Sequence, residues 1–296
     1  MKKPNELRVR AHGKINLYLD VVGKRNDGYH NLETVFHSIA LHDEVILREK
    51  SETGIKILCD YPDVPLDSNN LAYRAAQSLS DFVGGFSGLE IKINKRIPVA
   101  AGLAGGSANA AAVLVGVNTI FSLGLSDEML MTIGAKLGAD VPFCIQGGAA
   151  FGKGIGDILT PLPDLSDIPI VLINPGIAIS TSNIFRNLNI TLTKPSNESI
   201  IIRTCVEKGD IIGVGKNLYN LLEIPVFAKH AILSELKTRL STQTGCYGAL
   251  MSGSGASIFS LMENTVTAKQ CESLFKTSVS FCTTTHTYGL GVCIDN

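Results

Sequence analysis

Apolar and polar residues alternate in short runs over the first 60 residues, and this is the period of a half-buried β-strand. Turn-forming residues at 26–28 separate the second run from the third. The strands predicted in this half of the chain are 7–11, 15–21, 44–47 and 89–93. Helical spacing marks 69–83 and about 107–122, and Ser126 is placed to cap a third helix that would end at Gly138. A glycine-rich stretch at 149–156 is typical of a strand pair or turn.

A change in composition at 161–169, where prolines and aspartates surround short apolar pieces, marks the expected domain boundary. We therefore divide the chain into an N-terminal domain, residues 1–162, and a C-terminal domain, residues 163–296. The second domain should contain a polar loop at 191–199 and strands at 170–174, 249–252, 257–262 and 288–294. Its predicted helices are 199–208, 225–241 and 265–276. Strands and helices mix without a strict βαβ rhythm, which favours an α+β fold.

One stretch, 97–125, carries no charged residue and is therefore considered as a membrane-spanning helix. A spanning helix needs about 20 mostly apolar residues. Glycines at 102, 105 and 106 and polar residues at 107, 109 and 118 interrupt this one. A tight loop followed by a buried helix fits it better.

Composition narrows the class of protein. The 296 residues are 45% hydrophobic and 18% charged, with a net charge of −1. A broad nucleic-acid or anionic-membrane surface needs clustered Lys and Arg, so neither partner is expected. Seven cysteines, an odd number without a CxxC pair, argue against a zinc site or a disulfide framework. The start of the chain lacks the apolar run of a signal peptide, and we expect a cytoplasmic protein.

The glycine-rich segment 98–109, which we call the phosphate loop, precedes a strong helix former. Glycine allows positive φ and a close approach of the backbone to a ligand. The first helical turn then offers unpaired N–H groups and the positive end of its dipole, which suits a nucleotide's phosphates. A tight strand-to-helix turn is the structural alternative, and for a generic glycine-rich loop it is at least as common.

A second segment, 147–154, has the glycine spacing and the lysine of a Walker A loop. Glycine at 154 stands where that loop needs Ser or Thr to bind magnesium, and no helical pattern follows. We reject it as a phosphate site.

The phosphate loop and the segment 248–256 resemble the second and third motifs of the GHMP kinases. The stretches 11–19, 23–34, 138–143 and 174–176 are similar to a branch of that family that acts on a cytidylyl substrate. The resemblance spans nearly the whole chain, with its motifs in the family's order.

The resemblance implies a two-domain GHMP kinase fold, with an N-terminal domain like domain 2 of ribosomal protein S5 and a ferredoxin-like C-terminal domain. It also implies ATP-dependent phosphorylation of the 2-hydroxyl of 4-diphosphocytidyl-2-C-methyl-D-erythritol, a step in the non-mevalonate route to isoprenoid precursors. Mg²⁺ would bridge the ATP phosphates. Ala104 departs from the family's glycine and Ala108 from its frequent serine. We expect the loop to tolerate Ala104 with a negative φ, and Ser107 and backbone amides to bind the phosphates.

By the same resemblance, Asp140 is the catalytic base that accepts the proton of the substrate hydroxyl. Lys14, inside an otherwise apolar strand pattern, would be its partner and polarise the attacking oxygen. The alternative is that Lys14 and Asp140 form a structural ion pair without a catalytic role. Without the resemblance to the family, this interpretation would be favoured over the catalytic one.

The remaining site residues are also assigned by the resemblance. Tyr29 would stack on cytosine, His30 would hydrogen-bond its edge, and Phe185 would close the stack from the other side, although core packing is an alternative for Phe185. Asn16 and Thr181 would lie near the substrate, and Asn70 and Lys95 would flank adenine. ATP would also contact Pro98, Ala100, Gly102, Leu103, Ala104, Gly105, Gly106, Ser107 and Ala108, with Ser107 as the magnesium ligand.

Two other functions remain open at this point. A GHMP kinase acting on homoserine, mevalonate or a sugar would not need the aromatic pair at 29 and 30. A non-catalytic relative could bind a ligand through the same fold, although retention of Lys14, Asp140 and Ser107 speaks against it. The expected partner is a small molecule, and the expected state is a monomer or weak homodimer.

Overall fold

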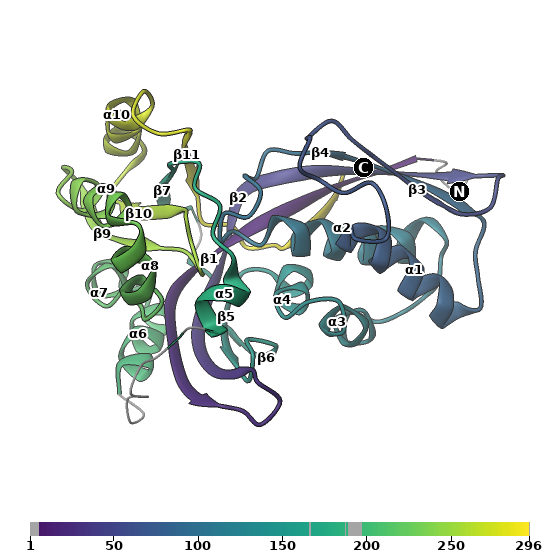
Figure 1. Cartoon of the computed structure of the whole chain (residues 1–296), viewed down its shortest axis with the longest axis horizontal. Coiled ribbons are helices and arrows are strands. Elements are labelled where there is room, and N and C mark those ends of the chain that lie inside the picture. Colours follow the sequence, from purple (N-terminus) through teal and green to yellow (C-terminus); the bar gives the residue numbers. More distant parts are fainter. Residues whose placement is uncertain (1–5, 166, 187, 189–196, 296) are drawn as a thin grey trace.

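The computed structural model describes residues 6–165, 167–186, 188 and 197–295, and it contains two β-sheets with helices packed against them (Figure 1). In the described residues the first sheet has the order β12-β1-β2-β4-β3, with β5 on β2, β6 on β5 and β8 on β1. Its strands are β1 (Glu6–Lys24), β2 (His30–Lys50), β3 (Ile55–Cys59), β4 (Gly88–Asn94), β5 (Ala149–Lys153), β6 (Ile158–Leu162), β8 (Tyr219–Asn220) and β12 (Val292–Asp295).

Strands β1 and β2 form one long antiparallel pair, where several short strands were predicted. Residues 12–14, which lie between two of the predicted strands, stay in β1 because the side chains of His12 and Lys14 are buried and the backbone pairs with β2. Irregularities between His12 and Lys14 and between Asn16 and Tyr18 shift the register. Such irregularities turn side chains locally, which the alternation alone does not reveal.

Helices cover one face of the first sheet (Figure 1). They are α1 (Leu71–Val83), α2 (Gly105–Ile120), α3 (Asp127–Ala135) and α4 (Val141–Gln146). Helix α2 is apolar on all sides because it is enclosed by β1, β2, α1 and α4. Of the helices that the structure describes, none is long and apolar enough to cross a membrane.

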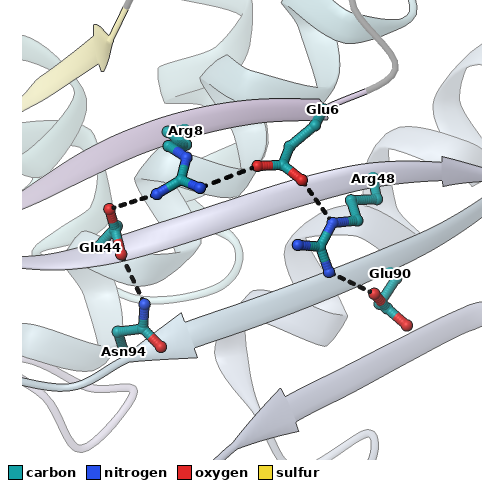
Figure 2. A network of polar contacts seen from close by, with 6 residues as sticks. All are labelled: Glu6, Arg8, Glu44, Arg48, Glu90 and Asn94. Atoms are coloured by element: carbon teal, nitrogen blue, oxygen red, sulfur yellow. Dashed lines mark hydrogen bonds and ion pairs between the residues drawn. The ribbon is translucent and has the colours of Figure 1, made fainter.

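The other face of this sheet carries a charged network across β1, β2 and β4 (Figure 2). Its residues alternate with the core residues of the same strands, as the period of two requires. Arg48 reaches Glu6 at 2.7 Å and Glu90 at 3.1 Å. Arg8 bridges Glu6 and Glu44 at 3.3 and 3.5 Å. These pairs give the exposed face a polar surface.

The second sheet is antiparallel, in the order β11-β7-β10-β9. Its strands are β7 (Pro169–Asn174), β9 (Cys246–Met251), β10 (Ile258–Met262) and β11 (Phe281–His286). The helices of this half are α5 (Thr181–Arg186), α6 (Glu198–Glu207), α7 (Ile211–Lys216), α8 (Glu223–Lys229), α9 (Ala231–Ser241) and α10 (Thr265–Phe275). Mixed helices and antiparallel strands agree with the predicted α+β class.

Most predicted elements are confirmed, with some corrections. Ser126 caps α3 by accepting from the N–H of Met129, as predicted, but the helix ends at Ala135, before Gly138. The helix predicted at 225–241 is wrong as one element, because His230 leaves helical geometry and separates α8 from α9. The strand predicted at 288–294 begins only at Val292, and β11 was missed. Most of the predicted loop at 191–199 lies outside the described residues.

The two halves of the chain share the first sheet. Strand β6 ends at Leu162 and β7 begins at Pro169, on either side of the expected boundary. Beyond it, β8 and β12 both pair with the edge of β1 opposite β2, β8 in parallel and β12 antiparallel. The division into residues 1–162 and 163–296 stays a prediction. The chain's last strand belongs to the sheet of the N-terminal half.

Candidate active site

A cavity of about 1090 Å³ lies where the two halves meet and is lined by both. In Figure 1, α5 lies near the middle of the molecule, beside the crossing of the long strands. The predicted site residues that line the cavity are Lys14, Asn16, Tyr29, His30, Asn70, Lys95, Pro98, Ala100, Gly102, Ala104, Gly105, Gly106, Ser107, Asp140, Thr181 and Phe185. Leu103 and Ala108 do not line it, and their side chains are buried in the core.

The phosphate loop forms the glycine-rich wall of the cavity, and three of its residues have positive φ: Ala100, Gly102 and Ala104. The expectation of a negative φ at Ala104 is wrong, because φ there is 57°. This left-handed residue is the N-cap of α2, where the chain must turn sharply from loop to helix. The family's glycine would adopt it without strain, whereas alanine is held there by its surroundings.

Gly102 is required for packing as well as for its φ of 74°. A Cβ atom at this position would overlap the carbonyl oxygen of Ser252. The hydroxyl of Ser252 donates to the carbonyl of Gly102 at 2.8 Å, and the N–H of Ser257 donates to Ala101 at 3.2 Å. The segment 248–256 of the C-terminal half therefore supports the phosphate loop from behind.

The N-terminus of α2 presents free donors to the cavity. The first bond of the helix runs from the N–H of Ala108 to the carbonyl of Ala104, at 2.8 Å. Among the described residues, the N–H groups of Gly105, Gly106 and Ser107 have no protein acceptor. No side chain caps this helix, so its orphan donors and positive dipole end are available to an anion.

Lys14 and Asp140 form an ion pair on the cavity wall, with Nζ 3.8 Å from Oδ2. Lys14 comes from β1 and is only 4% exposed. Asp140 is the N-cap residue of α4, but its carboxylate makes no cap hydrogen bond and its side chain is 34% exposed. The Ser107 hydroxyl lies close to the same segment, 3.8 Å from the position of a Cβ on Gly138. The structure thus gathers a carboxylate, an ammonium and a hydroxyl beside the free donors of α2.

Neighbouring side chains fix Lys14. Its Nζ donates to Oδ1 of Asn16 at 2.8 Å and lies 5.4 Å from the ring centre of Phe36. Asn16 in turn donates to the Thr34 hydroxyl at 2.8 Å, which donates to the carbonyl of Tyr18 at 2.6 Å. This chain of bonds across β1 and β2 leaves the ammonium little freedom. Holding the position of a reactive group is the usual purpose of such support.

A group of aromatic side chains also lines the cavity. Asp27 accepts from the Arg25 guanidinium and, at 3.1 Å, from the N–H of Tyr29, which stiffens the turn before that residue. Tyr29 is 61% exposed, an unusual state for a large aromatic side chain. The rings of His30 and Phe185 lie 5.6 Å apart.

The surroundings of His30 favour its neutral form. Burial, and then the positive charge of Lys24, lower its pKa below the ordinary value of 6.5. A neutral imidazole offers one donor and one acceptor to a ligand. This suits the edge of a heterocyclic base.

Two predicted ATP residues also have structural partners. Asn70 caps α1 by accepting from the N–H of Ala72 at 2.9 Å, and it donates to the carbonyl of Pro65 at 2.7 Å. Lys95 forms a buried ion pair with Asp43, a residue that sequence reasoning missed.

Other cavity residues were also missed. A Cβ on Gly253 would lie 3.4 Å from Nζ of Lys14, and the Ser254 hydroxyl bonds that of Thr181 at 2.6 Å. The glycine-rich motif at 248–256 was the available signal for both. The Walker-like segment 147–154 contains β5 and contributes no residue to the cavity wall.

Family models agree with this geometry. Residues 70–148 match the GHMP kinases N terminal domain, and residues 202–275 match the GHMP kinases C terminal domain. The first match contains the phosphate loop and Asp140.

Relatives and solved structures were compared with the whole chain. The protein named 4-diphosphocytidyl-2-C-methyl-D-erythritol kinase from Acetivibrio thermocellus is 46% identical over 87% of this chain and 90% of its own length. Its namesake from Alkaliphilus metalliredigens is 41% identical over 89% and 90%. A crystal structure of 4-(cytidine 5'-diphospho)-2C-methyl-D-erythritol kinase superimposes with a TM-score of 0.79 at 31% identity, covering 94% of this chain and 99% of that one.

A second solved structure shares the fold at much lower sequence identity. The homoserine kinase from Cytophaga hutchinsonii has a TM-score of 0.76 at 16% identity, covering 100% of this chain and 99% of that one. At this identity the likeness concerns the fold alone. The two relatives described above are far more similar to this chain in sequence, and they share one name. Together with the two family models, they show that the chain belongs to the GHMP kinase family, among the 4-diphosphocytidyl-2-C-methyl-D-erythritol kinases.

Proposed function

We propose that this protein transfers the γ-phosphoryl group of ATP to the 2-hydroxyl of 4-diphosphocytidyl-2-C-methyl-D-erythritol, a step towards isoprenoid precursors. The observation that carries the proposal is one continuous cavity with three parts. The free donors of α2, the aromatic residues Tyr29, His30 and Phe185, and the ion pair of Lys14 and Asp140 all line this cavity. The names of the curated relatives support the same substrate.

ATP would bind along the phosphate loop. The N–H groups of Gly105, Gly106 and Ser107, together with the helix dipole, would hold the phosphates. Leu103 and Ala108 would act indirectly, since their side chains pack in the core and the Ala108 N–H is used by the helix. Asn70 would approach the nucleoside end, whereas the Lys95 ammonium lies beside the start of α2, 3.0 Å from the position of a Cβ on Gly105.

Asp140 would take the proton of the attacking hydroxyl as its oxygen bonds to the γ-phosphorus and ADP leaves. Its uncapped carboxylate and partial exposure leave it accessible to a substrate. Lys14 would polarise the attacking oxygen from its fixed position. A nearly buried ammonium with one short hydrogen bond and one ion pair at 3.8 Å is poorly arranged for stability, which favours the catalytic role over a structural ion pair.

The cytidylyl end of the substrate would occupy the aromatic end of the cavity. Tyr29 would stack on cytosine and His30 would hydrogen-bond its edge. Phe185 would cover the opposite face after moving from its contact with His30. Asn16 and Thr181 would lie near the methylerythritol group between the two ends.

The Ser107 hydroxyl oxygen, near the start of α2, is a suitable ligand for Mg²⁺. The ion prefers hard oxygen ligands and usually keeps only one or two from the protein, with phosphate oxygens and water completing its shell. Ser107 supplies such an oxygen on the cavity wall. When bound, the ion would neutralise charge on the phosphates.

We also propose that a monomer or weak homodimer is active, without a nucleic-acid partner, since a net charge of −1 offers no broad basic surface. The seven cysteines are all free thiols, which supports the cytoplasm as its compartment. A single enzyme concentration series would test the first point, because activity per chain should stay constant on dilution.

Release of ADP by the purified protein tests the function. With ATP and Mg²⁺, the cytidylyl substrate should give rapid turnover, and homoserine, mevalonate and free methylerythritol should give little. Turnover of homoserine or mevalonate with none of the cytidylyl substrate would reassign the protein to another branch of the family. No ADP with any acceptor would favour a ligand-binding relative without catalysis.

A further inference from the structure

Asp43 is a fully buried carboxylate on β2 that lies outside the cavity. Its Oδ1 accepts from the backbone N–H groups of Arg96 and Ile97, at 2.7 and 2.9 Å. Its Oδ2 accepts from Nδ2 of Asn109 at 2.9 Å and pairs with the ammonium of Lys95. A buried carboxylate without partners would be very unfavourable, and here two backbone and two side-chain donors satisfy it.

The partners of Asp43 lie on both sides of the phosphate loop. Arg96 and Ile97 immediately precede the loop, and Asn109 lies on α2 at its other end. Both ends are therefore bonded to one carboxylate on a central strand of the sheet. This constrains a loop that must hold positive φ at non-glycine residues, including Ala104.

Lys95 connects the same carboxylate to the cavity. Its Nζ would lie 3.0 Å from a Cβ on Gly105, the first residue of α2, so the ammonium sits beside the free N–H groups of that helix. Within the described part of the chain, its side chain contacts Asp43 and, at 3.4 Å, Oδ1 of Asn109. An ammonium has three donors, so one remains for a ligand in the cavity that Lys95 lines.

We infer that Asp43 is a positioning residue of the nucleotide site: it fixes both ends of the phosphate loop and aims the Lys95 ammonium at bound ATP. This inference rests on the proposed kinase function. An ion pair serving stability alone could be replaced by neutral groups with little effect, since buried pairs often contribute no net stability. A pair serving the nucleotide could not be replaced without weakening ATP binding.

Three variants separate these roles. Asp43→Asn keeps an oxygen for the two backbone N–H groups but turns an amide towards the Lys95 ammonium. Lys95→Met leaves the buried Asp43 carboxylate without an opposite charge, although its hydrogen bonds to Arg96, Ile97 and Asn109 remain. The double variant Asp43→Asn/Lys95→Met restores a neutral network, in which the amide can donate to Asn109. Arg48→Met is the matched control, because it removes two ion pairs, with Glu6 and Glu90, from the outer face of the same strand (Figure 2).

The measurements are the melting temperature, ADP binding by calorimetry, and KM for ATP and for the cytidylyl substrate. For the double variant we expect a melting temperature near that of the wild type. Its Kd for ADP and its KM for ATP should rise about 10-fold or more. Its KM for the cytidylyl substrate should stay within about twofold of the wild-type value. Arg48→Met should leave both KM values unchanged. Asp43→Asn should show the same selective loss of nucleotide affinity where it folds.

Normal ADP affinity and normal KM for ATP in the double variant would overturn the inference. Equal increases in both KM values would also overturn it, because they would show a general structural role. Wild-type protein that binds ADP but phosphorylates no acceptor would refute the proposed function instead, and the ADP measurements would still test the positioning of the loop.

Discussion

At the scale of single residues, the cavity depends on side chains whose positions are set by a few short contacts. Lys14 is held by Asn16, and Tyr29 is held by the Asp27 turn. Each of these residues comes from the β1–β2 hairpin, which therefore supplies both the ammonium and the aromatic end of the site. Substitutions within this hairpin should separate substrate binding from nucleotide binding.

Tyr29→Ala should raise KM for the cytidylyl substrate about 10-fold, because one aromatic stacking partner of a base contributes about 1–3 kcal/mol. KM for ATP should stay within about twofold, since ATP is proposed to bind along the phosphate loop and not against Tyr29. Steady-state kinetics with each substrate varied in turn measures both. Tyr29→Phe, which keeps the ring, is the control and should behave almost as the wild type. Equal losses for both substrates in Tyr29→Ala would indicate a folding defect.

Gly102→Ala should lower the melting temperature strongly and abolish activity. The new Cβ would overlap the Ser252 carbonyl, and φ of 74° disfavours any residue with a side chain. Gly106→Ala is the matched control, because its Cβ would meet nothing closer than 3.7 Å and its φ is negative. Calorimetric melting of the two variants compares them directly. Similar melting temperatures would contradict the close packing of the phosphate loop on the segment 248–256.

At the scale of elements, the hairpin of β1 and β2 also carries a buried titratable group, His12. Burial lowers its pKa from 6.5 to about 4, and its Nε2 has no hydrogen-bond partner in the described structure. Between these two pH values the unfolded chain binds more protons than the folded one, so the free energy of unfolding must fall as pH drops from 6.5 to 4. The full contribution is about 3 kcal/mol.

His12→Phe should remove this dependence while keeping an aromatic ring against Tyr288, whose ring centre lies 4.3 Å from that of His12. Urea unfolding at several pH values between 4 and 7 gives the free energies of both proteins. The wild type should lose more stability than His12→Phe as pH falls, because other titrating groups act equally in both. Parallel curves would show that His12 titrates normally in the folded protein.

The sequence predicts elements well where a local signal exists. Ser126 marks the start of α3 because a cap is a local hydrogen bond, and the spacing of apolar residues indicated α1. The extent of β1 and β2 was missed, since polar residues such as Lys14 stay in the strand through contacts made far along the chain. The positive φ of Ala104 was missed for the same reason, because the surrounding structure imposes it.

At the scale of the whole molecule, the site exists only where separate segments meet. The ion pair joins residues 14 and 140, and the ring contact joins residues 30 and 185. No local pattern brings these together, so the sequence indicated them only through resemblance to a family. Resemblance to the family did not indicate Asp43, because its partners at residues 95–109 meet it only in the folded chain.

The sharing of the first sheet has a functional consequence at this scale. Strands β8 and β12 bind the C-terminal half to β1, the strand that carries Lys14. The segment 248–256, which also belongs to the C-terminal half, contacts the phosphate loop through the hydrogen bond from Ser252 to Gly102. Both halves of the chain thus hold β1 and the phosphate loop in place.

The central claim is that Asp140 takes the substrate proton in a site where ATP binds independently. The most direct test is the single-turnover rate of Asp140→Asn with saturating ATP, Mg²⁺ and cytidylyl substrate, together with its ADP affinity. The rate should fall about 10²–10⁴-fold, as expected for the loss of a general base, with ADP affinity unchanged. A single-turnover rate near that of the wild type would remove Asp140 from the mechanism and contradict the account.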